Sequence, residues 1–204
     1  MTGTLRVFEN RKGISQMTRN VSLIKGAAAG LIAGFVASWV MNQFQAKLAA
    51  LLEGNQKPHG AQSEQSGSPE HGAASYLAER GADHENDNAA ERTANVLAVA
   101  ILNQRLSKDE KKVGGTIFHY AFGASTGAFY GAVSELVPWL RSGLGLPFGL
   151  SVWAVADEGV VPVLGLSKWP IEYPLSVHGY ALASHLVYGL TTEMTHRITR
   201  RVLL

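Results

Sequence analysis

The stretch GLSVWAVADEGVVPVLG, Gly149 to Gly165, decides the fold of this chain. It has the apolar composition of a membrane helix, yet Asp157 and Glu158 lie side by side in its middle. An ionised carboxylate at the centre of a bilayer costs roughly 2.5 to 3.5 kcal/mol, so such a residue usually faces a bundle interior and has a partner. Pro162 adds a weak point, because proline cannot donate a hydrogen bond to the carbonyl of Glu158, four residues back. The stretch predicts a transmembrane helix with an acid pair at a kink.

The rest of the chain separates into apolar and polar segments, which a mean hydropathy of +0.03 over 204 residues conceals. Residues 1–23 and 45–112 are polar. Four apolar segments approach the roughly 20 residues that cross about 30 Å of hydrocarbon. These segments are residues 24–44, 113–137, 143–166 and 173–195. We therefore expect an all-α membrane protein, a four-helix transmembrane bundle with an extramembrane insert between the first and second spans.

Basic residues set the expected orientation. The first 23 residues carry several arginines and a lysine, and the chain closes with Arg200 and Arg201. The positive-inside rule places both termini, residues 1–23 and 196–204, in the cytoplasm. The uncharged run 26–46 exceeds the apolar core of about 7 to 15 residues of a cleaved signal peptide, which favours a signal anchor. A net charge of +2 is too small to indicate nucleic-acid binding, and the absence of cysteine excludes disulfides and thiolate metal ligands.

The insert begins with a polar stretch and ends in a helix pattern. Residues 54–88 are rich in Gly, Ser, Glu, Gln, Asn and Asp, a composition typical of chain without a fixed fold. The histidines within it are about 12 residues apart and match no metal-ligand signature, so a solvated loop is favoured over a metal site. These histidines are His59, His71 and His84.

Two capping patterns predict helix starts in the second half of the insert. Asn88 with Glu91 predicts an amphipathic helix over residues 89–106, lying on the membrane or against the bundle. Ser107 with Glu110 predicts that the helix leading into the second span begins outside the bilayer. The expected apolar face of the amphipathic helix comprises Ala90, Ala94, Leu97 and Ile101.

Small residues recur at every fourth position of the first and second spans. Such spacing makes a shallow groove along one helix face, where another backbone approaches closely in lipid. We interpret the two faces as helix-packing surfaces, in preference to a pore-lining strip, because these patterns commonly mediate helix contacts. The residues are Gly26, Gly30, Gly34, Gly123, Gly127 and Gly131.

Titratable residues in the second, third and fourth spans fall at similar depths. At 1.5 Å per residue, all of them lie in the outer half of the bilayer in the expected topology. The two histidines of the fourth span are about 10 Å apart, too far to ligate one metal ion without distortion. We interpret the set as a proton or cation site, or as a network that only fixes helix packing, with Asp157 as the interior-facing acid. The set is His119, Asp157, Glu158, His178 and His185, whereas Glu135, Glu193 and His196 belong near the inner interface.

Later segments resemble a known family. The runs FHYAFGASTGAFYG, FGLSVWAVADEGVVPVLGLSKWP and EYPLSVHGYALASHLVYGLTTE, within residues 89–201, resemble the YagU-like family of small bacterial inner-membrane proteins. The resemblance implies a multi-pass protein of the bacterial inner membrane, and it implies no reaction. Residues 54–88 depart from the family pattern.

Two functions follow as hypotheses. The first is proton or cation binding at the polar set, linked to transport or to envelope homeostasis. The second is a non-catalytic accessory or scaffold subunit, which docks to a larger membrane complex or to a second copy of itself through its glycine faces and insert. An enzyme ranks third, because no phosphate-binding loop, nucleophile elbow or metalloprotease motif is present. No cofactor is evident, and a bound cation is compatible with the polar set.

Overall fold

The computed structural model describes residues 2–52 and 87–202, with side chains from Gln16 to Leu51 in the first range. Helices α1 (Thr2–Leu52), α4 (Ala89–Leu102), α5 (Lys108–Leu136) and α8 (Leu175–Val202) form most of it. A further long helix is made of three consecutive parts, α6 (Leu146–Val152), η2 (Trp153–Val160) and α7 (Val161–Val163). Short 3-10 turns η1 (Pro138–Arg141) and η3 (Pro170–Glu172) connect the helices. The described residues contain no strand, which confirms the all-helical class; His59, His71 and His84 lie outside them.

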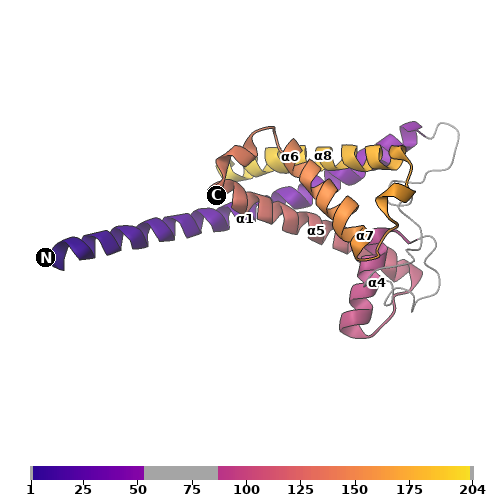
Figure 1. The fold of residues 1–204 in the computed structure, drawn as a ribbon, viewed down its shortest axis with the longest axis horizontal. Helices are drawn as coiled ribbons and strands as arrows, with labels where there is room; N and C mark the ends of the chain where they lie inside the picture. Colours follow the sequence, from indigo (N-terminus) through magenta and orange to yellow (C-terminus); the bar gives the residue numbers. More distant parts are fainter. Residues whose placement is uncertain (1, 53–86, 203–204) are drawn as a thin grey trace.

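Helix α1 extends well beyond the bundle. Its 51 residues correspond to about 77 Å, more than twice the roughly 30 Å of a hydrocarbon core. From Ser22 onward it contacts α5 and α8, while its N-terminal end projects away from the other helices (Figure 1). The polar segment 1–23 and the expected span 24–44 are therefore parts of one continuous helix from Thr2.

Glycines hold α1 and α5 at backbone contact distance. A Cβ atom added to Gly30 would lie 2.1 Å from the carbonyl oxygen of Gly127, and one added to Gly34 would lie 2.1 Å from that of Gly123. Gly131 stands in the same relation to Gly26. The two glycine faces therefore face each other inside the chain, where no side chain fits between the backbones.

The helix that ends in α7 approaches α8 in the same way, through glycines outside the first two spans. A Cβ atom on Gly149 would lie 2.2 Å from the carbonyl oxygen of His185, and one on Gly189 would lie 2.3 Å from that of Gly145. Gly145 has a φ of +81° and precedes α6, so it has a second reason to be glycine. These contacts fix the acid-bearing helix beside the histidines of α8.

Helix α4 begins as expected but buries a different face. The capping boxes of Asn88 with Glu91 and of Ser107 with Glu110 are both present, which confirms the two predicted helix starts. The helix ends at Leu102 rather than at 106, because Asn103 adopts the left-handed conformation, with φ 52°, and caps it. Of the predicted apolar face, Ala94 is buried whereas Leu97 and Ile101 are exposed, so this face does not pack against the bundle as a whole, and its lying on the membrane stays a prediction.

The buried face of α4 is small and polar. Its buried residues are Arg92, Ala94, Asn95 and Ala98. Close packing on α5 explains the small residues, since a Cβ atom on Gly114 would lie 2.9 Å from that of Ala94. The polar residues bond to loops that no periodicity reveals: Arg92 donates to the carbonyl of Leu166 at 3.2 Å, and the side chain of Asn95 accepts from the backbone of Leu106.

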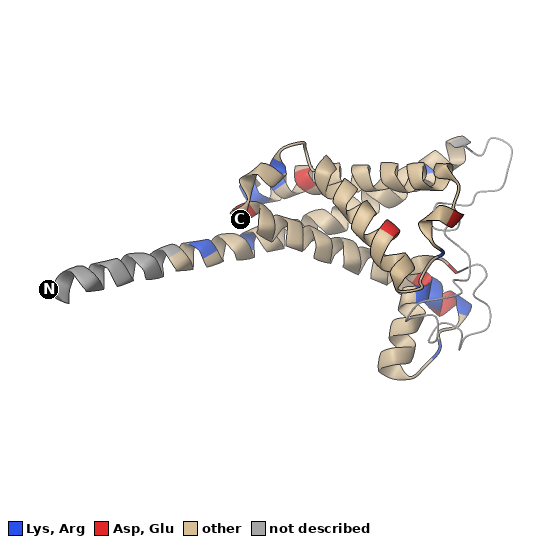
Figure 2. Cartoon of the chain, in the orientation of Figure 1, with Lys and Arg blue, Asp and Glu red and all other residues tan. Residues whose placement is uncertain are grey.

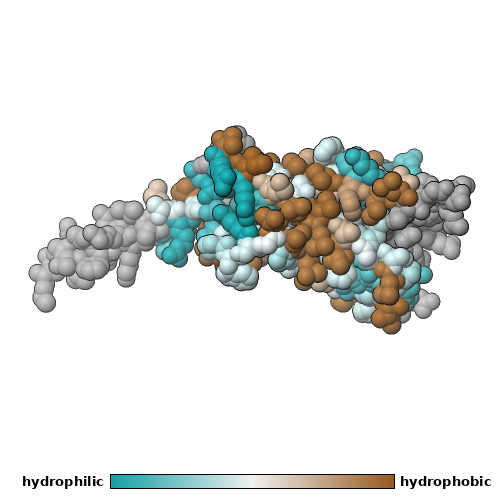
Figure 3. Space-filling view, turned by 90° about the horizontal axis from the view of Figure 1, so that it is seen from above, coloured by the Kyte–Doolittle hydropathy of each residue, from teal (hydrophilic) through white to brown (hydrophobic). Residues whose placement is uncertain are grey.

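Polarity is distributed in the opposite sense to that of most water-soluble proteins. Phe129, Ile117 and Val155 are 70%, 64% and 63% exposed. Apolar residues form a band across the middle of the molecule, with hydrophilic patches toward both ends (Figure 3). Charged residues gather mainly at the two ends (Figure 2). The largest fully buried side chains are all polar, namely Arg92, His196, Glu193, Asn95, Thr192, Ser38, Ser134 and Ser184.

Two helices in the described part of the chain are long and apolar enough to span a membrane, by length and composition. They are Gln16–Leu51 within α1 and Leu146–Val163 across α6, η2 and α7. Helices α5 and α8, with 29 and 28 residues, have the length but are less apolar, since polar residues recur along both. Four transmembrane crossings therefore remain a prediction.

Candidate functional site

The acid pair lies in a widened segment of the third long helix. Residues Trp153 to Val160, η2, form a π-helix, and the N–H of Val161 bonds to the carbonyl of Ala156, five residues back. Pro162 supplies the physical reason for this register. In an α-helix the carbonyl of Glu158 would face the nitrogen of Pro162, which has no hydrogen, whereas a π register moves the donor position to residue 163. The predicted weak point is therefore a π segment that contains both acids, and π segments often occur at functional sites.

Glu158 pairs with His178 of α8. The Oε1 atom of Glu158 lies 2.7 Å from Nδ1 of His178, and both side chains are 22% exposed. The other ring nitrogen of His178, Nε2, lies 2.9 Å from the carbonyl oxygen of Pro170. A carbonyl oxygen only accepts hydrogen bonds, so Nε2 carries a proton.

That assignment determines how many protons the pair holds. If Nε2 carries the only ring proton, Nδ1 is an acceptor, and it would face a second acceptor, the carboxylate, at 2.7 Å. The contact becomes a hydrogen bond only when one further proton lies between them, on the imidazole or on the carboxyl group. The Glu158 and His178 pair therefore holds one proton more than a neutral histidine beside an ionised glutamate.

Asp157 faces a different histidine of the same helix. Its Oδ2 atom lies 3.6 Å from Nδ1 of His185, which in turn lies 2.9 Å from the carbonyl oxygen of Ala181. The Nδ1 hydrogen of His185 is thus directed to Ala181, and this pair requires no additional proton. The adjacent acids therefore have distinct partners about two helical turns apart on α8.

Asp157 and His185 line a cavity that Glu158 and His178 do not line. The cavity has a volume of about 370 Å³ and receives His119 from α5 and Ser38 from α1. His119 Nε2 and Ser38 Oγ are buried and have no hydrogen-bond partner among the residues that the structure describes. The five residues predicted from the sequence therefore form two groups, an acid and histidine pair beside η3 and a cavity with one acid and two histidines.

Metal coordination needs more ligands than either group brings together. Among the residues that the structure describes, no three His, Cys, Asp or Glu side chains are placed to hold one ion. Each acid has one close histidine, and Pro162 and Tyr173 surround the smaller group of Glu158 and His178. The arrangement can share protons between carboxylate and imidazole, and it can present one negative charge to the cavity.

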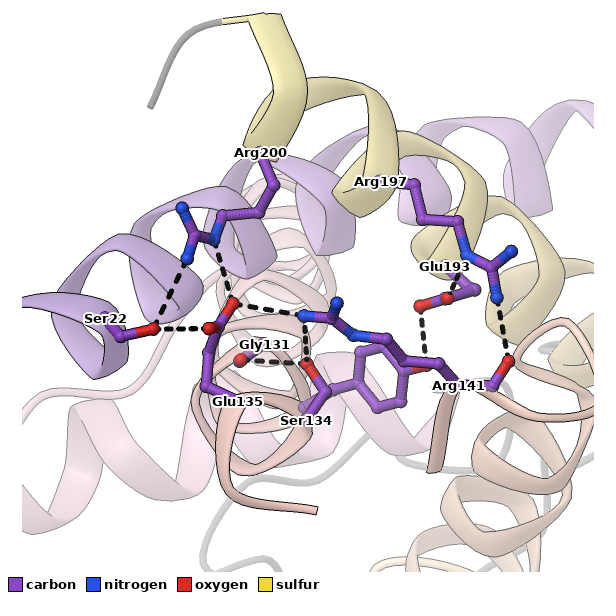
Figure 4. A network of polar contacts seen from close by, with 9 residues as sticks. Ser22, Gly131, Ser134, Glu135, Arg141, Glu193, Arg197 and Arg200 are labelled. Carbon is purple, nitrogen blue, oxygen red and sulfur yellow. Dashed lines mark hydrogen bonds and ion pairs between the residues drawn. The ribbon is translucent and has the colours of Figure 1, made fainter. Parts of the chain in front are cut away.

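A second polar network lies at the other end of the bundle (Figure 4). Glu135 of α5 accepts from Arg200 of α8 at 2.8 Å, from Arg141 of η1 at 3.1 Å, and from Ser22 of α1. The bond to Glu135 raises the pKa of Arg200 above its ordinary value. This network joins three helices that are far apart in the sequence. The sequence pattern that could have predicted part of it is the i, i+4 spacing of Glu193 and Arg197 on one helix.

Glu193 is the buried centre of the same network. It is fully buried, accepts from the Tyr130 hydroxyl at 2.6 Å and pairs with Arg197. Arg197 also donates to the backbone carbonyl of Arg141 at 2.8 Å. His196 lies fully buried beside the ring of Tyr130, and within the described part of the chain neither of its ring nitrogens is hydrogen-bonded. The network is therefore a tight structural connection, in which Glu135 and Glu193 each bond to at least one arginine.

A known protein family matches more than half of the chain. Residues 72–194 match the family described as "Protein of unknown function (DUF1440)", a range that contains both acid and histidine groups. No curated protein and no solved structure matches the chain.

Proposed function

The chain belongs to the family of proteins of unknown function (DUF1440), and we propose that it is a multi-pass membrane protein that binds protons at Glu158 and His178. Proton binding there is linked to transport or to pH and ion homeostasis across the membrane. The observation that carries the proposal is the 2.7 Å contact between Glu158 and a histidine whose other nitrogen already donates to a carbonyl. A group that holds a proton in this way gains or loses it when its surroundings change.

The distribution of polarity supports the membrane location. Exposed apolar side chains cover the middle of the helices while the largest fully buried side chains are polar, an arrangement that is favourable when the surrounding medium is lipid. Two helices meet the length and composition of spans, and the four crossings and the bacterial inner membrane come from the sequence patterns and the YagU-like resemblance. Arg197 and Arg200 near the end of α8, together with Arg141 of η1 beside them (Figure 4), favour a cytoplasmic location for that end of the bundle and for both termini.

Protons fit the site better than metal ions. Among the described residues each acid has one close histidine, and a metal ion in a protein generally takes three or more ligands. A carboxylate and an imidazole in a low-dielectric medium share a proton readily, because the ion pair and the neutral pair are then close in free energy.

The accessory-subunit alternative has less support. It docks the chain to a partner through the glycine faces, and these faces pack against each other within the chain. A partner would have to separate α1 from α5 to reach them. Docking through residues 53–86, which lie outside the described residues, is the part of that hypothesis that remains.

Infrared titration of the full chain in lipid nanodiscs tests the proposal. We expect the wild type to show a carboxyl or imidazole band that titrates with pH, and Glu158→Gln to remove it. Asp157→Asn should affect a separate transition, since Asp157 faces His185. Asp109→Asn, which changes an exposed carboxylate in the first turn of α5, serves as the matched control. An unchanged spectrum in Glu158→Gln, with the variant still folded, would show that this pair does not exchange a proton.

A further inference from the structure

The connection between α7 and α8, residues 164–174, lies over the two acids, and we call it the strap. It contains η3 and lies at the end of the bundle away from the C-terminus (Figure 1). Strap residues, among them Ser167 and Pro170, line one small pocket together with the acid pair of η2. Ile171, in the middle of η3, is 95% exposed, so its side chain does not anchor the strap. The position of the strap over the acids therefore depends on its hydrogen bonds.

Two side chains from separate helices donate to backbone carbonyls of the strap. Arg92 of α4 donates to the carbonyl of Leu166, near the start of the strap, at 3.2 Å. Nε2 of His178, on α8, donates to the carbonyl of Pro170 in η3 at 2.9 Å. Arginine keeps its charge across the ordinary pH range, whereas histidine gains and loses a proton within it. Of these two bonds, the one from His178 is therefore the one that can respond to pH.

The number of protons on the Glu158 and His178 pair decides whether the imidazole keeps both of its contacts. With the additional proton, Nε2 donates to Pro170 and a hydrogen bond joins Nδ1 to Glu158. When that proton leaves, the ring has one hydrogen for two acceptors. A hydrogen on Nε2 leaves the Nδ1 lone pair 2.7 Å from the carboxylate, and a hydrogen on Nδ1 leaves the Nε2 lone pair 2.9 Å from the carbonyl. One of the two contacts is then lost.

The contact that is lost is the one to the strap. A hydrogen bond to an ionised acceptor is roughly twice as strong as one between neutral groups. The single remaining hydrogen is therefore more stable on Nδ1, where it donates to the carboxylate of Glu158. The carbonyl of Pro170 then faces a lone pair, and η3 loses its bond to α8.

Three other titratable side chains lie near His178. Asp157 of η2 and Lys168 of the strap line the same small pocket, and the ring of Tyr173 lies 6.4 Å from the imidazole, between ring centroids. Lysine and tyrosine ordinarily titrate at about pH 10, above the range of histidine. Asp157 is the other group that can titrate near neutral pH, so the experiment includes a variant of it.

We infer that His178 is a proton-dependent latch for the strap. While the pair holds its additional proton, the strap is closed over the acids; when the proton leaves, the strap is released and the small pocket opens. The inference rests on the proposed function, because it requires the pair to exchange a proton, and it adds regulation to that site. Proton loss and access to the acids are thereby coupled through one imidazole.

Pairs of spin labels in the full chain in nanodiscs measure the position of the strap. The chain contains no cysteine, so labels attach only at introduced ones. The strap pair is Ile171→Cys with Phe129→Cys on α5, at positions that are 95% and 70% exposed. The matched control pair is Val163→Cys, 60% exposed at the end of α7, with Phe129→Cys. Pulsed electron resonance gives the distance between the two labels of each pair.

We record the distance from about pH 5 to about pH 9, a range that includes the ordinary histidine transition. For the strap pair we expect a narrow distance distribution at low pH and loss of that narrow peak at high pH. For the control pair we expect no change, because α7 lies outside the strap.

Two substitutions should fix the strap in opposite states at every pH. Glu158→Gln supplies an amide N–H to Nδ1, so the ring hydrogen stays on Nε2 and the distribution should remain narrow. His178→Ala removes the bond to Pro170, so the distribution should remain broad. Asp157→Asn should respond to pH as wild type does.

The infrared titration of the same samples separates the latch from the proposed function. A titrating band of the pair together with a strap distance that does not change with pH overturns the latch alone, whereas the absence of a titrating band overturns both. A pH response that persists in Glu158→Gln, or that disappears in Asp157→Asn, also contradicts the latch. A strap distance that changes at the pH of the infrared transition, and that Glu158→Gln holds constant, supports it.

Discussion

The contact between α1 and α5 makes a quantitative prediction for the substitution Gly30→Ala. The new Cβ atom would lie 2.1 Å from the carbonyl oxygen and 2.9 Å from the carbonyl carbon of Gly127. Both are backbone atoms, so no side chain can rotate away. The two helices must separate by about 1 Å at this level to reach an ordinary van der Waals distance. The matched control is Gly179→Ala on α8, where an added Cβ atom meets nothing within 4 Å.

The expected magnitude follows from the difference between these two variants. Both gain about 1 kcal/mol of helix propensity, because alanine is less flexible than glycine in the unfolded chain. Only Gly30→Ala loses packing, since a gap of about 1 Å forfeits up to half of the dispersion energy of the atoms that face it. Overpacked sites typically lose about 1 to 3 kcal/mol. We expect Gly30→Ala to be less stable than Gly179→Ala by that amount.

Thermal unfolding of the full chain in one detergent, followed by the loss of the monodisperse size-exclusion peak, measures the difference. For a chain of this length each kcal/mol corresponds to about 2 to 4 °C in Tm. We expect Gly179→Ala to unfold at or above the wild-type temperature and Gly30→Ala to unfold below it. Equal Tm values for the two variants would refute the close backbone contact between α1 and α5.

Three further substitutions test individual polar contacts. Glu193→Ala should cost about 1.5 to 3 kcal/mol in thermal unfolding, because it leaves the buried Tyr130 hydroxyl without its charged acceptor, and Glu193→Gln should cost less; a neutral Glu193→Ala would contradict the buried network. Arg92→Ala should cost about 1.5 to 3 kcal/mol by removing the bond to the Leu166 carbonyl, and wild-type stability would exclude that role. Bonds from Ser107 lower the pKa of Glu110, so the stabilisation they give is present above the ordinary glutamate pKa and is lost as the pH falls. Ser107→Ala should raise the pKa of Glu110 toward its ordinary value in an NMR titration of labelled protein, and an unshifted pKa would argue against the capping box.

Local signals in the sequence located several elements. Asn88 and Ser107 with their glutamates marked two helix starts, because a capping box is satisfied by residues three positions apart. Tertiary contacts decided which face of α4 is buried, where Leu97 is exposed and Arg92 is buried. A polar side chain is buried there because a loop carbonyl far along the chain accepts its hydrogen bond.

The candidate site divides in the same way between local and distant information. The sequence identified both acids and all three histidines of the apolar segments, since titratable residues stand out in such surroundings. Their similar depths in the bilayer did not predict that they form two separate groups. It depends on the π segment, which sets the directions of Asp157 and Glu158, and on the loop carbonyl of Pro170, which fixes the proton of His178.

The sequence by itself determined that this protein is helical, that its apolar segments have nearly the length of membrane spans, and that acids and histidines lie within them. Periodicity, composition and caps act over a few residues, so they can be read along the chain. Only the tertiary structure decided which histidine each acid faces, that a cavity separates α5 from η2, and that Glu135 and Glu193 join Arg200 and Arg197 at the opposite end. Those outcomes depend on how closely whole helices approach, and the approach is set by glycines that meet only after folding.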